Sequence, residues 1–484
     1  MSRDLRTALA ELADQMPPAR TDEVWRAGRR MRRRDRTRMA ARLVVVLLVA
    51  AALTLPAVWY RPLPSPATGE AAVPARVWTP WMWQGTVAQA PAGPATLLFS
   101  GDGFGLRGTD LFDHEGKVAV VGQDGSYRML LYGGAQTVVG EEVQVSPNGR
   151  YVAQGHLAGT DPGWLVVTDL TDGRSRTITG PDGTTCCAEP VAWAPDGDSV
   201  LVMDRPAYPV GFDPVTGYGI APARLVLLDL TTGVSRVLVE ELGDRWKLRT
   251  ASLAAFSPDG AWIALTQGSR VSLLNRSGAV AWTRDLGPGR HLAGVGAFSP
   301  DGRRIATVAL DGCQDECDRA ALAARTWRFG YLDAASGVDT DGPAIGPVTA
   351  MAVRALGWRL GTDLVALTYR PENDARKAAD VPFNDTGWFE VGDATLVALR
   401  PGGGSDVLVD SPGEVLAMDV PRDLLESGRF GGPARQPAPF PARPLILLPA
   451  VPLVVVLIGV AVPVIFWVRR RRRRLDGIEG LRGG

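Results

Sequence analysis

One short phrase occurs twice in this chain, and its recurrence narrows the folds that the sequence can adopt. Residues Phe256–Leu265 read FSPDGAWIAL, and the chain reads FSPDGRRIAT from Phe298 to Thr307. In such a phrase Pro presets φ at the second position of a turn, Asp tolerates the third, and Gly supplies the left-handed conformation that follows. Apolar and β-branched residues on both sides predict that the turn joins two strands of a hairpin.

The turn occurs in four clear copies, each followed by a strand-like run. The prolines of the copies stand at positions 147, 195, 258 and 300. Because the last position of the turn is left-handed, we expect a positive φ at its glycine in every copy. These glycines are Gly149, Gly197, Gly260 and Gly302.

A second phrase closes each unit. Trp164–Ile178 (WLVVTDLTDGRSRTI) matches Ala223–Leu238 (ARLVLLDLTTGVSRVL), and weaker forms occur at Val271–Trp282 and Arg328–Thr340. Each consists of an apolar strand, a glycine-containing turn and another strand. One unit therefore holds four antiparallel strands in roughly 40–60 residues, which is the period of a β-propeller blade. An open array of hairpins is the alternative, but closure into a ring removes exposed strand edges and is favoured.

Degenerate copies extend the array at both ends. Asp113–Tyr132 precedes the first clear copy, and Ala355–Arg370 with Ala394–Asp410 follows the last. The sequence therefore predicts an all-β fold with six blades, in which strands from both termini complete the end blades. A seventh blade in residues 77–108 or 411–430 is the alternative.

The paired phrases resemble the WD40-like, or PD40, repeat of the TolB-type six-bladed propellers. The resemblance covers about residues 96–420, and it is specific in the four clear copies and loose elsewhere. True WD40 repeats carry a recurring Gly-His pair and a Trp-Asp pair, and neither recurs in this chain. The resemblance implies a propeller with a binding role, and it implies no single ligand.

Two apolar runs flank the repeats. Neither Leu43–Trp59 nor Leu445–Val468 contains a charged residue. A bilayer core needs roughly 20 apolar helical residues, so both runs are predicted as transmembrane helices. Arginine clusters precede the first run and follow the second, and positive charge remains cytoplasmic. Both termini are thus predicted to be cytoplasmic and residues 61–443 extracytoplasmic; a cleaved signal peptide is the alternative for the first run.

Seven segments follow from these observations. They are a basic cytoplasmic segment (1–42), a transmembrane helix (43–60), a Pro-rich tether (61–95), the β-propeller (96–420), a second tether (421–443), a second transmembrane helix (444–468) and a basic cytoplasmic tail (469–484). Between the basic ends, acidic residues outnumber basic ones, which disfavours nucleic acid as a partner. The scarcity of Lys, with abundant Ala, Gly and Pro, resembles proteins of actinobacteria.

Motifs for catalysis and cofactor binding are missing from the sequence. The chain has three His residues, no G-x-S-x-G elbow, no P-loop and no H-E-x-x-H motif. We therefore predict no catalytic residue, no cofactor and no metal site. Cys313 and Cys317 are predicted to form a disulfide around an acidic loop, with a calcium site as the alternative there. The pairing of Cys186 and Cys187 stays open.

Long insertions predict where a ligand binds. Asp204–Ala223, Leu310–Thr326 and Arg370–Trp388 each follow the second strand of a unit, and the Cys186–Cys187 loop follows a fourth strand. Loops at these places leave the same face of a propeller, and insertions on one face usually mark a binding surface; drift of unconstrained loops is the alternative. The candidate aromatic anchors on this face are Tyr208, Phe212, Tyr218, Phe383 and Trp388.

The sequence favours a non-enzymatic, membrane-anchored propeller that binds a protein, a peptide or an envelope component outside the cell. One alternative is a sensor or anti-sigma-like regulator that acts through the N-terminal segment, where Asp4–Met16 has helical apolar spacing. Another alternative is a degenerate propeller enzyme. Trp78, Trp81 and Trp83 follow the first apolar run, and they either lie at the membrane surface or fill the first blade.

Overall fold

The computed structural model describes most of the chain between residues 71 and 439. The described residues are 7, 71–101, 116–132, 139–155, 163–183, 188–204, 223–242, 253–375 and 391–439, except residues 82, 141, 315, 374 and 414. Residues 61–443 form one compact unit. No helix among the described residues is long and apolar enough to cross a membrane, and the predicted spans at 43–60 and 444–468 lie outside them.

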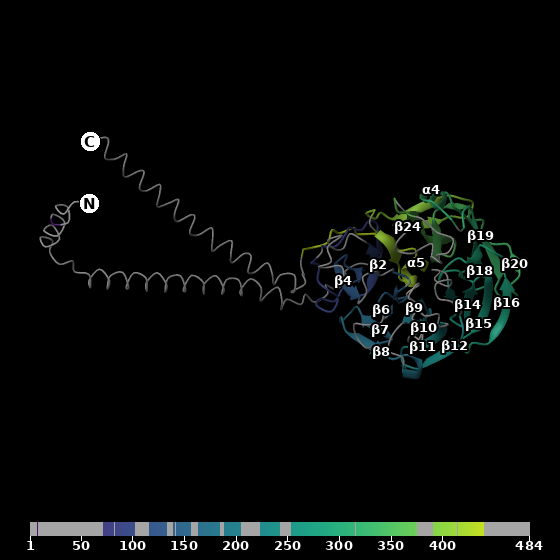
Figure 1. The fold of residues 1–484 in the computed structure, drawn as a ribbon, viewed down its shortest axis with the longest axis horizontal. Coiled ribbons are helices and arrows are strands. Elements are labelled where there is room, and N and C mark those ends of the chain that lie inside the picture. Colours follow the sequence, from purple (N-terminus) through teal and green to yellow (C-terminus); the bar gives the residue numbers. More distant parts are fainter. Residues whose placement is uncertain are drawn as a thin grey trace, which may run out of the picture. The chain divides into compact units, whose positions relative to one another are not determined.

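Six antiparallel sheets are arranged in a ring (Figure 1). The first three sheets, each ordered from its first strand outward, are β26 (Val415–Asp419), β2 (Ala95–Gly101), β3 (Gly116–Gly122) and β4 (Tyr127–Tyr132); β5 (Val143–Val145), β6 (Tyr151–Gly155), β7 (Leu165–Asp169) and β8 (Ser175–Ile178); and β9 (Ala188–Trp193), β10 (Ser199–Asp204), β11 (Arg224–Asp229) and β12 (Ser235–Val239). A 3-10 turn, η2 (Pro181–Gly183), lies between the second and third sheets.

The remaining three sheets repeat the same order. They are β13 (Ala254–Phe256), β14 (Trp262–Gln267), β15 (Arg270–Asn275) and β16 (Val280–Asp285); β17 (Arg290–Leu292), β18 (Arg304–Asp311), β19 (Thr326–Asp333) and β20 (Asp339–Thr340), with β21 (Val348–Thr349) also on β19; and β22 (Ala352–Arg359), β23 (Asp363–Pro371), β24 (Val391–Leu399) and β25 (Ser405–Val409). The six-bladed propeller predicted from the repeats is therefore confirmed.

The serine and aspartate of the repeated phrase have a definite role in the turn. In the copy after β13, the Ser257 hydroxyl donates to Asp259 Oδ1 at 2.5 Å and accepts the backbone N–H of Trp262 at 2.9 Å. Asp259 Oδ1 also accepts the N–H of Ala261 at 3.0 Å. The side chains thus satisfy backbone donors that a tight turn would leave to water. The hydrogen bond from Ser257 lowers the pKa of Asp259 below its usual range.

The glycines of the turns have a positive φ, with values of 74° at Gly149, 76° at Gly197, 69° at Gly260 and 69° at Gly302. Each of the last three faces the turn proline of the preceding blade. A Cβ on Gly260, for example, would lie 3.4 Å from Pro195 Cδ. The repeated turns therefore also pack against one another around one face of the ring.

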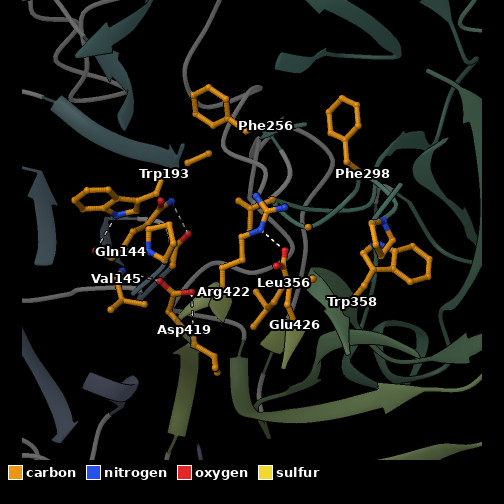
Figure 2. Close-up of a pocket in the computed structure, with 18 residues that line it drawn as sticks. Gln144, Val145, Trp193, Phe256, Phe298, Leu356, Trp358, Asp419, Arg422 and Glu426 are labelled. Atoms are coloured by element: carbon orange, nitrogen blue, oxygen red, sulfur yellow. Dashed lines mark hydrogen bonds and ion pairs between the residues drawn. The ribbon is translucent and has the colours of Figure 1, made fainter. Parts of the chain in front are cut away.

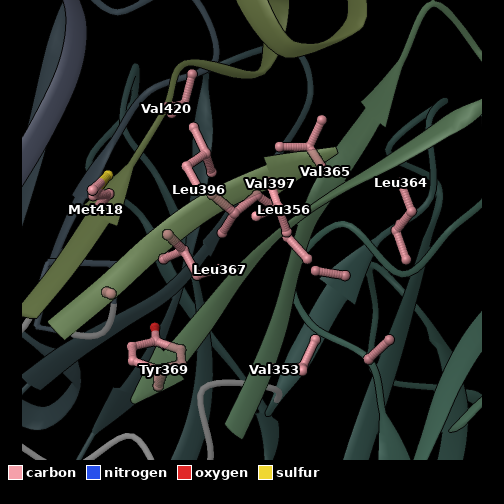
Figure 3. Packing of buried hydrophobic residues seen from close by; sticks show 14 of the residues in the cluster. Val353, Leu356, Leu364, Val365, Leu367, Tyr369, Leu396, Val397, Met418 and Val420 are labelled. Atoms are coloured by element: carbon pink, nitrogen blue, oxygen red, sulfur yellow. The ribbon is translucent and has the colours of Figure 1, made fainter. Parts of the chain in front are cut away.

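Closure of the ring depends on the last strand of the propeller. β26 pairs with β2, so that Phe99 lies opposite Met418, and it completes the first blade from the C-terminal side. Met418 and Val420 pack in the same hydrophobic cluster as Leu367 and Leu396 of the sixth blade (Figure 3). The predicted use of strands from both ends of the array is confirmed, and the seventh blade is wrong, because its candidate segments supply β2 and β26 to the first blade.

The two segments predicted as tethers contact each other beside the first blade. β1 (Val73–Pro74) pairs in parallel with β27 (Phe430–Gly432), and the backbone N–H of Val73 donates to the carbonyl of Arg429 at 2.8 Å. Further along, the N–H of Val87 donates to the carbonyl of Met129 at 2.9 Å, which extends the sheet beyond β4. The chain therefore enters and leaves the propeller at one place.

Turn geometry offers a matched pair of substitutions. Gly149→Ala and Gly260→Ala both place a Cβ at a positive φ, which costs roughly 1 kcal/mol. The Cβ on Gly149 would also lie 2.3 Å from the carbonyl oxygen of Ala95, whereas that on Gly260 meets no backbone atom within 4 Å. We expect thermal unfolding of the full chain to show a clearly larger loss of melting temperature for Gly149→Ala. Equal losses would mean that the close approach of Ala95 adds no cost.

Candidate functional site

A cavity of about 80 Å³ lies where the first strands of the six blades end, on the side of the repeated turns (Figure 2). Every blade contributes lining residues, and in each blade one of them stands at or near the point where the chain leaves the first strand for the second. In chain order these residues, which we call the cavity ring, are Val145, Trp193, Phe256, Phe298, Trp358 and Asp419. Strand register supports the equivalence, because Val145, Phe256 and Phe298 each lie opposite the residue seven positions later.

The two tryptophans of the cavity ring differ in whether their indole N–H groups have a hydrogen-bond partner. Trp193 donates its indole N–H to the carbonyl of Gln144 in the neighbouring blade at 3.3 Å. Trp358 is 4% exposed, and its indole N–H has no hydrogen-bond partner among the described residues. A buried donor without a partner costs about 1–3 kcal/mol. Trp358 therefore lines the cavity with its apolar ring, while its indole N–H is a buried donor without a partner among the described residues.

Asp419 is the one charged member of the cavity ring. Its Oδ2 accepts the N–H of Val145 at 2.9 Å and its Oδ1 accepts that of Val420 at 3.1 Å. Burial raises the pKa of Asp419 to about 6, although the Arg354 guanidinium and the two N–H groups act in the opposite direction. Arg354 is fully buried in β22 and donates to the carbonyl of Met418 at 3.0 Å. The first blade thus contributes a titratable carboxyl to an otherwise apolar ring.

A short helix stands at the mouth of the cavity. In α5 (Arg422–Glu426), Arg422 Nε donates to Glu426 Oε1 at 2.5 Å, and both side chains line the cavity (Figure 2). Pro421 precedes the helix and packs against Gly149 of the second blade. In the same way, each repeated-turn proline of the second, third and fourth blades lies next to the turn glycine of the following blade. In the first blade α5 therefore takes the place of the tight turn, and it brings charge to the rim.

The insertions predicted to bind ligand leave from the opposite ends of the strands. They connect β10 to β11, β18 to β19 and β23 to β24. The aromatic anchors proposed from the sequence lie outside the described residues, as does the Cys186–Cys187 pair; the anchors are Tyr208, Phe212, Tyr218, Phe383 and Trp388. The structure does not bring these residues together with the cavity ring.

Ion pairs join the two strands at the base of all three insertions. The pairs are Asp204–Arg224, Asp311–Arg328 and Arg370–Asp393. Asp204 is fully buried and also accepts the Trp164 indole N–H at 2.6 Å, whereas Asp311 and Arg328 are more than half exposed. Removing one partner of a buried pair costs about 3–5 kcal/mol, but an exposed pair contributes about 0–1 kcal/mol. The 205–222 insertion therefore has the most firmly fixed base.

The insertion of the fifth blade is described almost completely. Cys313 and Cys317 form a disulfide, followed by α4 (Arg319–Ala323). Arg325 is fully buried, and its Nε donates to the carbonyl of Cys313 at 2.8 Å. Arg319 Nε donates to the carbonyl of Glu372 at 3.1 Å. Helix α4 in the fifth-blade insertion therefore contacts the base of the sixth-blade insertion.

Sequence reasoning missed the cavity ring, although a signal for it exists. In the clear copies the ring residue directly precedes the repeated turn, so this position could have been read from the alignment of the phrases. The position of Asp419 could not have been read in this way, because its strand is followed by Val420–Pro421 and a helix instead of the tight turn.

The fold defines the class of this protein: a six-bladed β-propeller closed by its C-terminal strand. Among solved structures it is similar to TolB from Acinetobacter baumannii (14% identity, 55% of this chain and 52% of that chain covered, TM-score 0.31). It is also similar to a putative TolB from Agrobacterium tumefaciens (17%, 52% and 82%, TM-score 0.31) and to an oligogalacturonate lyase in complex with manganese (12%, 71% and 80%, TM-score 0.34).

The chain spans about half the length of the first of these structures. No protein-family model and no curated protein matches the sequence. The similar structures include a lyase as well as TolB proteins, and their identities and TM-scores are too low to support an argument about activity. The fold assignment therefore depends on the strand pairing described above.

The raised pKa of Asp419 predicts a pH dependence of stability. Between about pH 4, where an ordinary Asp titrates, and about pH 6, the folded chain holds a proton at Asp419 that the unfolded chain has released. This contribution to stability is complete below that range and is lost as pH rises through it; two pKa units correspond to about 3 kcal/mol. We expect Asp419→Asn to remove this fall from the pH profile of the melting temperature.

Asp301 provides a control of opposite sign. The Ser299 hydroxyl lowers the pKa of Asp301, so the stability that Asp301 contributes is lost as pH falls. Asp301→Asn should therefore alter the acid side of the profile and leave the fall between pH 4 and 6 in place. If Asp419→Asn keeps the wild-type profile, the carboxyl does not titrate as described.

Proposed function

We propose that this protein is a membrane-anchored β-propeller that binds a protein, peptide or envelope ligand outside the cell without catalysing a reaction. The two apolar runs and the arginine clusters beside them support the anchoring and its direction. Pairing of β1 with β27 supports it as well, because the chain enters and leaves the propeller at one place. Both connecting segments can then run to the same membrane.

The observation that carries the binding role is the cavity with its aromatic wall. Trp193, Phe256, Phe298 and Trp358 offer apolar surface, and Asp419 adds a carboxyl to it. Ligand sites commonly combine an apolar wall with a few fixed polar groups. At about 80 Å³ the cavity is smaller than the pockets that hold whole ligands, so we expect it to receive a single apolar side chain of a protein or peptide partner.

The insertion face is a second candidate surface on the same protein. Its support is the sequence position of the insertions, all of which follow the second strand of a blade, and the ion pairs at their bases. Loops that carry function are commonly held by a rigid scaffold in this way. Tyr208, Phe212 and Tyr218 are the proposed contact residues in the longest insertion.

Capture of partners by the detergent-solubilised full chain tests the binding role. Val295 is half-buried in the cavity wall, so Val295→Trp fills the cavity, whereas Val338→Trp places the same side chain on the outside of a blade, where Val338 is 52% exposed. We expect Val295→Trp to reduce the captured amount of a specific partner and Val338→Trp to leave it unchanged. Deletion of residues 208–218 tests the insertion face in parallel. Capture that survives both changes would contradict both surfaces.

Reporter fusions test the membrane topology. A reporter that is active only outside the cytoplasm should be inactive when fused at residue 1 or 484 and active when inserted near residue 250. The reason is that arginine clusters flank both apolar runs on their terminal sides. An active reporter at residue 484 would exclude the proposed orientation.

A further inference from the structure

Two tryptophans of the first tether hold the second tether beside the first blade. Trp81 and Trp83 stack with their ring centroids 4.9 Å apart and their planes 16° apart. The Trp81 indole N–H donates to the carbonyl of Pro437 at 3.0 Å, and that of Trp83 donates to the carbonyl of Pro439 at 3.2 Å. We call these four residues the tryptophan clasp.

The tryptophan clasp does not fill the first blade. Trp81 is 45% exposed, and the core of that blade is formed by strand residues such as Phe99 and Tyr127. Residues 84–87, directly after the pair, run along the edge of β4. Of the two sequence interpretations of these tryptophans, packing inside the blade is therefore wrong for Trp81. An exposed, rigidly held aromatic surface remains to be explained.

The length of chain after the tryptophan clasp limits where this surface can lie. Pro439 is five residues before residue 444, where the second transmembrane helix is proposed to begin. Because a chain extends at most about 3.6 Å per residue, Pro439 lies within about 20 Å of the start of that helix. The first tether is longer, because about a dozen residues separate residue 60 from Val73, and it allows about 45 Å. The second tether therefore sets the distance from the membrane.

The chemistry of the surface suits the lipid interface. Tryptophan concentrates at the headgroup level of membranes, where its flat apolar ring meets a region that is neither water nor hydrocarbon. In the clasp both indole N–H groups already have acceptors, so the rings can enter that region without losing a hydrogen bond. Arg435, which is exposed on the tether between the β1–β27 pair and the clasp, adds a positive charge that attracts lipid phosphate.

We propose that the tryptophan clasp docks the edge of the first blade onto the bilayer, with Trp81 and Trp83 at the level of the lipid headgroups. This inference depends on the proposed function, since it needs the second transmembrane helix. It adds a specific contact to that function: the propeller does not move freely on its tethers but lies against the membrane by one edge.

Quenching of tryptophan emission by brominated lipid tests the proposal on the full chain in nanodiscs. The emission of a given tryptophan is the difference between wild type and the variant that replaces it with Phe. We expect the emission removed by the W81F/W83F pair to be severalfold lower in discs of brominated lipid than in discs of ordinary lipid. Trp262, which is 38% exposed in β14, is the matched control, and its emission should be the same in both discs.

Trp467 separates failure of the docking from failure of the proposed anchoring. It lies at the end of the second apolar run, so its emission should be quenched if that run spans the bilayer. Quenched Trp467 with unquenched Trp81 and Trp83 would overturn the docking alone. Unquenched Trp467 would overturn the anchoring, and the docking with it, because the docking needs the anchor. If the double variant loses its near-ultraviolet circular dichroism, the single variants W81F and W83F carry the test.

Discussion

The pairing of β26 with β2 is the contact on which the rest of the structure depends. Blades of a propeller contact only their neighbours, so without this pairing the first and sixth blades would each expose a hydrophobic side and the ring would be open. The pairing joins segments from opposite ends of the propeller sequence, since Leu98 lies opposite Asp419. It also places Asp419 in the cavity ring, brings α5 to the cavity mouth and returns the C-terminal tether to the N-terminal one.

The functional candidates lie where the repeat is interrupted. The cavity-ring residue is aromatic in four blades and valine in one, but in the first blade it is Asp419. The same blade replaces the tight turn with α5, whose Arg422 and Glu426 line the cavity. A repeated architecture supplies the rigid frame, and the irregular blade supplies the charge.

The local parts of this fold could be predicted from the sequence, and the long-range parts only in outline. The turns at Gly149, Gly197, Gly260 and Gly302 depend on four neighbouring residues each, so the phrase itself indicates them. The first strand of the closing blade, Val415–Asp419, has no turn phrase after it, which is why residues 411–430 also suited a seventh blade. The complete cavity ring can be recognised only when all six blades are superposed. The contact of Trp81 could not be predicted, because its hydrogen-bond acceptor, Pro437, comes from the other end of the propeller.

The parallel pairing of β1 with β27 has a mechanical consequence. The free end of β1 is its amino end and that of β27 is its carboxyl end, so a force that draws the two chain ends apart acts along both strands in opposite senses. Under such a load the hydrogen bonds from Val73 to Arg429 and from Ala75 to Gly432 are sheared together instead of being peeled apart one after the other. Tension on the tethers would therefore reach this pair before it reached β26, and the closing strand of the ring would be shielded from the pull.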